Sequence, residues 1–197
     1  AGAVAALASH GLGFPLLLRR PGFHTGKHFV HVGGPDALAS AVAAMPGNEL
    51  MAIEYLNAYG SDGCARKYRV MMIDGRLYPL HLAISEHWKV HYFTAAMADH
   101  PAHQAEEAAF LRTMPQVLGE TAMMALRSIQ AALGLDFGGV DFGIDAAGNV
   151  LLFEANPTML VNPPDTDAQW DYRRTAAEDA LNAARRMLIA RASSASG

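Results

Sequence analysis

The sequence predicts an α+β protein that is divided into two lobes. Short runs with the alternating pattern of half-buried strands recur along the chain, and the segments 105–134 and 167–190 have apolar residues at helical spacing. With 197 residues, of which 51% are hydrophobic, the chain is long enough to bury a core. We expect a small lobe at 1–56, a large lobe at 57–190 and a disordered polar tail at 191–197.

The composition limits which classes of partner and which cellular compartment we expect. A net charge of −4 gives no basic field for nucleic acid, and nowhere do 18 apolar residues run together, so we expect neither a nucleic-acid nor a membrane partner. Cys64 is the only cysteine, which rules out an intrachain disulfide and a cysteine-based zinc site and favours the cytoplasm. The chain lacks an initiator Met, so we expect it to be a piece of a longer or trimmed polypeptide.

The first lobe is predicted from three strand-like runs and one helix. Strands at 14–20 and 28–32 flank the glycine-containing segment PGFHTGK, which indicates a hairpin with a loop at its tip. Apolar residues at helical spacing predict a short helix at 35–44. The run LMAIEYL at 50–56 predicts a third strand, and the loop AYGSDGCAR follows it.

The second lobe opens with two strands within 67–85, joined at Asp74-Gly75, which is a strong signal for a two-residue hairpin. The segment 87–104 is rich in histidine and aromatic residues but has no clean period, and we expect a long, partly ordered loop there. The helix at 105–134 is expected to bend near Pro115 and Gly119 and to end at Gly134. A hairpin at 138–156 and a last helix at 167–190 complete the lobe.

The hairpin 138–156 holds the chemistry. If Asp145 pairs with Val150 around the turn, Asp141 lies opposite Glu154, because facing positions then have a constant sum. The period of two then places Asn156 on the same face as these acids. The opposite face is uniformly apolar and is expected to cover a core: Phe142, Ile144, Leu151, Phe153 and Ala155.

Two carboxylates and an amide oxygen at one sheet end suit a hard divalent cation. Mg²⁺ prefers oxygen ligands and completes its coordination shell with water and phosphate oxygens. We therefore expect Mg²⁺, or Mn²⁺ in its place, together with a nucleotide. The alternative is that Asp141 and Glu154 are ordinary strand-end acids paired with Lys or Arg.

The spacing D-x₃-D-x₂-G-x₅-E-x-N resembles the metal-binding signature of the ATP-grasp superfamily, of the type of glutathione synthetase, ribosomal-protein glutamate ligase and D-alanine:D-alanine ligase. The resemblance extends in order over nearly the whole chain. It implies two lobes, each with an antiparallel sheet and helices, and ATP between them. It also implies a further N-terminal substrate domain or a partner chain, for which this chain has no room.

The resemblance also implies roles for individual residues. FPLLLRRPGFHTGKHFV stands where the family has a phosphate-binding strand and hairpin, MAIEYL where it has the adenine-binding hinge, and KYRVMMIDG where it has a D-x-R strand. The implied ligands are Arg19 or Arg20 and Lys27 for the phosphates, Glu54 and Leu56 for adenine, Asp62 for ribose, Arg69 and Lys89 for catalysis, and Asp141, Glu154 and Asn156 for the metal.

Each of these assignments has a plainer alternative. The first hairpin could be a basic surface loop, Glu54 a solvated edge acid, and His87 and His91 surface or substrate contacts rather than zinc ligands.

The sequence also departs from the family pattern at three places. Lys67 replaces the usual acid of the D-x-R strand, which points to a changed substrate or metal environment. Gly139 stands where D-alanine ligases have an arginine, and PTMLVNPP replaces a Pro-Gly loop.

The resemblance implies an ATP- and Mg²⁺-dependent ligase. It would join a small-molecule or peptide carboxylate to an amine or similar nucleophile through an acyl phosphate. Two other readings stay open, a non-catalytic ATP-binding module of a larger polypeptide and a small-molecule kinase.

Overall fold

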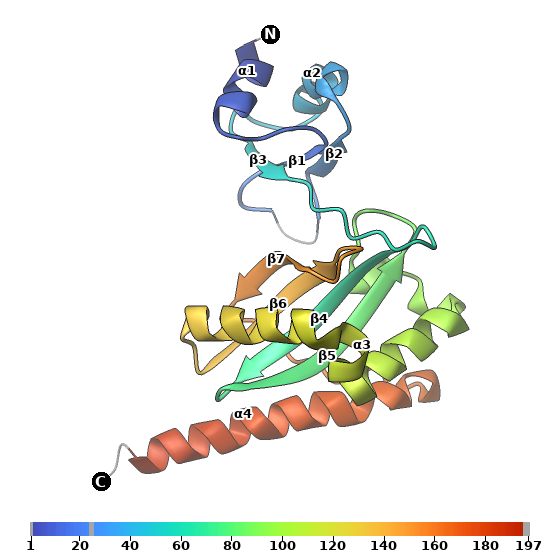
Figure 1. Ribbon diagram of the computed structural model, residues 1–197, viewed down its shortest axis with the longest axis vertical. Helices are drawn as coiled ribbons and strands as arrows, with labels where there is room; N and C mark the ends of the chain where they lie inside the picture. The colour runs from blue at the N-terminus through green and yellow to red at the C-terminus, as the bar shows by residue number, and fades with distance from the viewer. Residues whose placement is uncertain (1, 24–25, 195–197) are drawn as a thin grey trace. The chain divides into compact units, whose positions relative to one another are not determined.

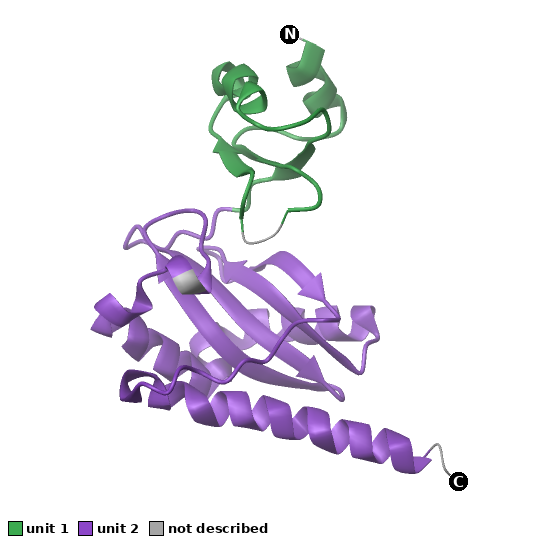
Figure 2. Cartoon of the chain, turned by 180° about the vertical axis from the view of Figure 1, so that it is seen from behind, with its two compact units in different colours: residues 1–56 green, residues 57–197 purple. Residues whose placement is uncertain are grey.

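The computed structural model describes residues 2–23 and 26–194. The chain divides into two compact units, Ala1–Leu56 (unit 1) and Asn57–Gly197 (unit 2), which are coloured separately in Figure 2. Each unit has its own antiparallel sheet and its own buried core. Within the described part of the chain, none of the helices has the length and apolar character needed to cross a membrane.

Unit 1 is a three-stranded sheet in the order β2-β1-β3 with two short helices (Figure 1). Leu16 and Leu18 alternate into a core with Val32 and Leu38, and side chains of both helices pack on that core. Because neighbouring residues of a strand point to opposite faces, Arg19 lies on the other face of the sheet. The elements are α1 Gly2–Ser9, β1 Leu16–Arg19, β2 Phe29–Val32, α2 Pro35–Ala43 and β3 Met51–Glu54.

The strands of unit 1 are shorter than predicted. The strand expected at 14–20 spans four residues, and so does the strand expected at 50–56. The predicted hairpin between β1 and β2 is present as an antiparallel pair with Leu16 opposite Val32. Part of its predicted tip, residues 24 and 25, lies outside the described residues.

Unit 2 is a four-stranded sheet in the order β5-β4-β6-β7 with a long helix on each face (Figure 1). The turn between β4 and β5 has positive φ at both Asp74 and Gly75, as the predicted two-residue hairpin requires. The elements are β4 Ala65–Ile73, β5 Arg76–Ser85, η1 Tyr92–Thr94, η2 Met97–Asp99, α3 Pro101–Leu133, β6 Phe137–Ile144, β7 Val150–Asn156, η3 Ala168–Arg173 and α4 Arg174–Ser194.

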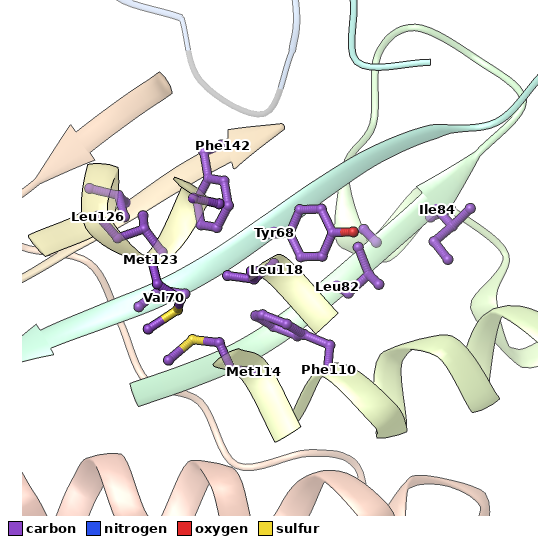
Figure 3. Close-up of a cluster of buried hydrophobic side chains, with 14 of the residues drawn as sticks. Tyr68, Val70, Leu82, Ile84, Phe110, Met114, Leu118, Met123, Leu126 and Phe142 are labelled. Carbon is purple, nitrogen blue, oxygen red and sulfur yellow. The ribbon is translucent and has the colours of Figure 1, made fainter. Parts of the chain in front are cut away.

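The two faces of this sheet are sorted by the alternation of β4. Tyr68 and Val70 pack with Phe142 against Phe110 and Leu118 of α3, as the close-up in Figure 3 shows. The intervening side chains belong to a second core with helix α4, which contributes small residues to it. That second core consists of Met71, Ile73, Leu80, Met159, Ala177, Ala180, Ala183 and Met187. Lys67 and Arg69 continue the row of Met71 and Ile73, so they lie on the α4 face.

Helix α3 confirms the expected bend and end. Thr113 and Gly119 have non-helical backbone angles on either side of Pro115, and Gly134 is a left-handed C-cap with φ 59°. The prediction of a long loop at 87–104 was wrong in part. That segment contains two 3-10 turns, and α3 begins at Pro101, because proline is well suited to the first turn of a helix.

The C-terminal helix also differs from its prediction. The segment expected as one helix at 167–190 is a 3-10 turn followed by α4, which continues to Ser194. Residues 191–194, predicted to be disordered, are therefore helical, and Arg191 forms ion pairs with Asp74 and Asp136 that hold this end. The rest of the predicted tail lies outside the described residues.

The predicted register of β6 and β7 is confirmed at Asp141 and wrong beyond it. Asp141 is opposite Glu154 as predicted, but a bulge after Asp141 shifts the pairing, so that Phe142 faces Leu152 and Gly143 faces Leu151. Leu151 therefore shares the face of Asp141 instead of the apolar face. Leu152 and Phe153 are 38% and 40% exposed, because β7 is the edge strand of the sheet.

Candidate functional site

Asp141 lies on the α4 face of the unit 2 sheet, between two cations of the neighbouring strand. Its carboxylate accepts hydrogen bonds from Arg69 Nε at 2.6 Å, from Arg69 Nη2 at 2.8 Å and from Lys67 Nζ at 2.9 Å. Arg69 is the direct cross-strand partner of Asp141, and Lys67 stands two residues before Arg69 on the same face. The lysine that replaces an acid of the family pattern thus forms an ion pair with Asp141.

The Asp141 carboxylate is charged although it is only 2% exposed. Burial by itself would raise its pKa, but the hydrogen bonds from Arg69 and the charge of Lys67 outweigh burial and hold the pKa at about 2. Two cations surround this one carboxylate, and the nearby Glu154 also acts on the charge of Arg69.

Glu154 and Asn156 lie on the same face as Asp141, at the end of the edge strand. Glu154 is the cross-strand partner of Asp141, and Asn156 is the partner of Gly139. The Glu154 side chain is exposed and accepts a hydrogen bond from Asn156 Nδ2 at 3.2 Å. The Asn156 Oδ1 atom accepts from the backbone N–H and the hydroxyl of Thr158, both at 2.8 Å. The sheet therefore brings the three predicted metal ligands onto one face.

The three oxygen-bearing side chains fit a magnesium ion unequally. Glu154 and Asn156 present a carboxylate and an amide oxygen at an open strand end, which is the ligand chemistry Mg²⁺ prefers. Asp141 already binds two cations through both of its oxygens, so it fits only when Lys67 leaves Oδ2, which would then share its lone pairs between Arg69 and the ion. The metal assignment stays a prediction. Among the described residues, no group of three or more His, Cys, Asp and Glu side chains could hold a metal ion.

Gly139, next to this cluster, has no room for a side chain. A Cβ atom placed there would lie 2.5 Å from Met159 Sδ and 2.9 Å from Met71 Sδ. Met159 follows β7 and is buried in the core under α4. The thioethers of two methionines thus occupy the space next to Gly139.

A pocket of about 550 Å³ adjoins Lys67 and Arg69 within unit 2. The strand β5 contributes two consecutive residues, Leu80 and His81, to its wall. In a regular strand these side chains would point to opposite faces, but a bulge in the β4–β5 pairing at this point places both against the pocket. Two further segments complete the wall, which includes His91, Tyr92, Ala96, Met97, Ala98, Leu160, Asn162, Pro163, Pro164, Asp165, Trp170 and Arg173.

Arg173 enters this pocket from η3 and is held there by a buried network. Its Nε atom lies 3.1 Å from Glu107 Oε1, and its guanidinium lies 4.2 Å from the centre of the Tyr92 ring, whose hydroxyl it also contacts. Glu107 is fully buried on α3 and accepts further hydrogen bonds from the Tyr172 hydroxyl at 2.5 Å and from the backbone N–H of Leu82 at 3.2 Å. The sequence analysis missed this network, because its members are far apart in the sequence. Tyr172 is 65 positions from Glu107, and Arg173 is 81 positions from Tyr92. The run WDYRR was a local signal for part of it.

The other predicted residues of unit 2 lie elsewhere. Asp62 accepts both guanidinium N–H groups of Arg66, at 3.0 and 2.7 Å, and the backbone N–H of Cys64. These bonds lower its pKa below the usual range, with the Arg66 hydrogen bond as the main cause. Lys89 is exposed on the segment that follows β5, and it is absent from the described lining of the pocket.

In unit 1, the two candidate arginines point to different surroundings. Arg19 lies on the sheet face away from the helices and donates to the backbone carbonyl of Phe23 at 2.9 Å. The guanidinium of Arg20 instead packs directly on Gly47, which has no Cβ to obstruct it. Lys27 is exposed, with Nζ 5.6 Å from the centre of the Phe23 ring.

The two residues predicted to bind adenine lie at the C-terminal end of unit 1. Glu54 is the exposed last residue of β3, opposite Leu16, and Leu56 is half-buried at the boundary of the unit. Their contacts with a nucleotide stay a prediction.

Comparison with solved structures identifies the fold. The D-alanine–D-alanine ligase of Bacillus anthracis matches 96% of this chain with a TM-score of 0.51 and 18% sequence identity, over 58% of its own length. The corresponding ligase of Helicobacter pylori matches 92% of this chain, with a TM-score of 0.48, 13% identity and 52% of its length. The carboxyaminoimidazole ribonucleotide synthase of Aspergillus clavatus, solved with ATP, matches 91%, with a TM-score of 0.47, 14% identity and 44% of its length.

The chain therefore has the ATP-grasp fold, as the sequence motifs predicted. It spans about half the length of these solved chains. No protein-family model matches the sequence, and no curated protein matches it.

Proposed function

We propose that this chain is the ATP-binding part of a ligase that joins a carboxylate to an amine. The proposal depends on one observation: Asp141 and Glu154 are cross-strand partners, with Asn156 on the same sheet face, in a chain with the ATP-grasp fold. The neighbouring solved structures are ligases and synthases of this kind, which supports the general reaction but not a substrate.

The proposed reaction has two steps. A carboxylate oxygen of the substrate attacks the γ-phosphorus of ATP, the bond to the bridging oxygen breaks, and ADP leaves. The amine nitrogen then attacks the acyl carbon, the carbon–oxygen bond to the phosphate breaks, inorganic phosphate leaves, and the nitrogen loses a proton. No protein nucleophile is needed, so catalysis depends on positioning and on electrostatic stabilisation.

The residues of unit 2 would supply that stabilisation. Glu154 and Asn156 would hold Mg²⁺, with Asp141 as a further ligand once Lys67 has moved. The ion would neutralise charge on the phosphates when bound. Arg69 is fixed beside Asp141 and would stabilise negative charge near the reacting carboxylate. Lys89 would contact the terminal phosphate.

The residues of unit 1 and the loop after it would bind the nucleotide. Arg19 is the better candidate for the phosphates, because Arg20 packs on Gly47. Lys27 would add a second cation. Glu54 and Leu56 would contact adenine, and Asp62 would contact ribose after exchanging Arg66 for the sugar hydroxyls.

Calorimetry with ATP and Mg²⁺, beside an assay for released phosphate with pooled carboxylates and amines, tests the proposal. We expect binding that requires Mg²⁺, and weaker binding for Asp141→Asn and Glu154→Gln. A cation-bound carboxylate contributes about 1.5–3 kcal/mol through its hydrogen bonds, so the loss is expected to be about tenfold to hundredfold. Unchanged ATP–Mg²⁺ affinity in both variants would refute the proposed site.

A second candidate is an ATP-binding module without catalysis. It is favoured by the ion pairs that occupy Asp141. Binding of ATP and Mg²⁺ without phosphate release would support this candidate. A stable phosphorylated product in place of an amide would instead identify a small-molecule kinase.

A further inference from the structure

The pocket beside Lys67 and Arg69 combines these two cations with a mostly apolar wall. Both cations pair with the buried carboxylate of Asp141, and the exposed Glu154, opposite Asp141, also acts on the charge of Arg69. The side chains of Lys67 and Arg69 are 16% and 24% exposed, and both line the pocket. An anion that enters the pocket would meet cationic donors shielded from bulk water, where charge-assisted hydrogen bonds are strong.

Arg173 has a carboxylate of its own. Its guanidinium is paired with the buried Glu107 and lies over the ring of Tyr92, with the Trp170 ring 5.9 Å away. Burial raises the pKa of Glu107, and the charge of Arg173 opposes that rise. Arg173 therefore acts as a fixed planar wall between two aromatic side chains, and Lys67 and Arg69 are the cationic donors that an anion in the pocket would meet.

His81 supplies an unsatisfied polar atom in the same pocket. Its side chain is 6% exposed, and its Nδ1 atom has no hydrogen-bond partner among the described residues. The bulge at Leu80 and His81 directs the ring into the pocket next to Tyr92, with the two ring centres 4.9 Å apart. A buried polar atom without a partner costs free energy, so a ligand that reaches it with a donor or acceptor gains affinity.

The remaining wall is mostly apolar, with the amide of Asn162 and the carboxylate of Asp165 among its polar members. Leu80, Met97 and Leu160 line it, together with Pro163 and Pro164. The volume of about 550 Å³ is within the range of about 300–1,000 Å³ that is usual for pockets of small ligands. Such walls favour a ligand whose body is a hydrocarbon chain or an aromatic ring.

We propose that this pocket binds a small carboxylic acid with an apolar or aromatic body. The carboxylate lies between Lys67 and Arg69, a polar group next to it meets His81 Nδ1, and the body contacts Tyr92 and Trp170. This inference rests on the proposed function, in which this acid is the one that ATP activates. Because Asp141 joins Lys67 and Arg69 to the face of Glu154, the carboxylate end is the end next to the proposed phosphate site.

Calorimetry of the full chain without ATP tests this binding. The probes are 3-phenylpropionate and its uncharged amide, 3-phenylpropanamide, at millimolar concentration. We expect the acid to bind and the amide to bind about tenfold to hundredfold more weakly, which corresponds to the loss of a hydrogen-bonded charge. Equal binding of both probes, or binding of neither, would overturn the inference.

Three variants locate the binding. Lys67→Met removes one of the two cationic donors and is expected to weaken binding of the acid by about tenfold or more. Ala98→Trp places a large side chain at an exposed position of the pocket wall and is expected to abolish it without disturbing the core. Arg191→Met removes a cation from the far end of α4 as the matched control, and should leave binding unchanged. Acid binding that survives Ala98→Trp would place the acid elsewhere and refute the inference.

ATP–Mg²⁺ binding by the same preparation separates the two proposals. If the acid does not bind but ATP–Mg²⁺ does, only the pocket inference is refuted. If the acid binds as expected in the probe and variant experiments but ATP–Mg²⁺ does not bind, the pocket is supported and the proposed ligase function is refuted.

Discussion

At the scale of single residues, two carboxylates of unit 2 are buried, and cationic partners satisfy both. Asp141 is held by Lys67 and Arg69, and Glu107 is held by Arg173 with help from Tyr172. A buried ion pair adds little net stability, but removing one member leaves the other charge without a partner, which is costly. Replacing one member of either network is therefore expected to lower the free energy of unfolding by a measurable amount.

Glu107→Ala is expected to destabilise unit 2 by about 3–5 kcal/mol, because Arg173 and the Leu82 N–H would lose their buried partner. Urea denaturation measures this change in the free energy of unfolding. Glu120→Ala, at an exposed position of the same helix, is the matched control and should stay within about 0.5 kcal/mol of the wild type. A small effect of Glu107→Ala would mean that the network forms only weakly in solution.

His81 predicts a pH dependence of stability. Burial is the main reason that its pKa lies well below the ordinary value of 6.5. The positive charges of Arg69, Lys67 and Arg173 lower this pKa further, and the negative charge of Asp141 opposes them. The unfolded chain then binds a proton at a higher pH than the folded chain, so stability is full above the unfolded pKa and falls as the pH drops below it.

Urea denaturation at about pH 7.5 and about pH 5.5, on either side of the ordinary histidine pKa, measures this loss. His81→Phe keeps an aromatic ring beside Tyr92 and removes the titrating group, so its stability should fall less over the same interval. His87→Phe controls for the removal of an exposed imidazole. An identical fall in the wild type and His81→Phe would show that His81 does not contribute.

At the scale of elements, the bend of α3 depends on Gly119. Its backbone angles, φ 76° and ψ 171°, are in a region that is open essentially to glycine alone. Gly119→Ala is expected to destabilise the protein by about 1–3 kcal/mol, despite the higher helix propensity of alanine. Thermal or urea denaturation measures it, with Ser128→Ala in the regular part of α3 as control. A stabilised Gly119→Ala would indicate a straight helix in solution.

Elements with a strong local signal were predicted from the sequence. The Asp74-Gly75 turn, the C-cap at Gly134 and the bend between Thr113 and Gly119 depend on neighbouring residues, so the sequence alone indicates them. The two bulges could not be predicted. A bulge adds one residue to a strand without changing its composition, and the apolar run 150–153 is compatible with either register.

In the candidate site, too, the sequence predicted the local pairing but not the pairing between distant strands. The pairing of Asp141 with Glu154 follows from one hairpin, and the sequence predicted it. The pairing of Asp141 with Lys67 and Arg69 joins strands 72 or more positions apart, and it depends on β4 lying between β5 and β6. Only that sheet order shows why a lysine can replace an acid at position 67.

At the scale of the whole molecule, the two units differ in the size of their cores. Among the described residues, the core cluster of unit 1 has four buried apolar side chains, whereas unit 2 has two larger clusters, one on each face of its sheet. We expect the amides of β1 and β3 to exchange hydrogen faster than those of β4, because local opening costs less where fewer apolar contacts are lost. Hydrogen exchange followed by mass spectrometry measures this, with the edge strand β7 as an internal reference. Equal protection in β1 and β4 would contradict it.

Gly139 has a consequence for the engineering of this chain. Because the thioethers of Met71 and Met159 lie where a Cβ atom would be, a side chain introduced at position 139 requires both methionines to shift. Substitutions at positions 71, 139 and 159 are therefore expected to be non-additive. A library that varies the three positions together is expected to yield larger side chains at 139 more often than a library that varies position 139 alone.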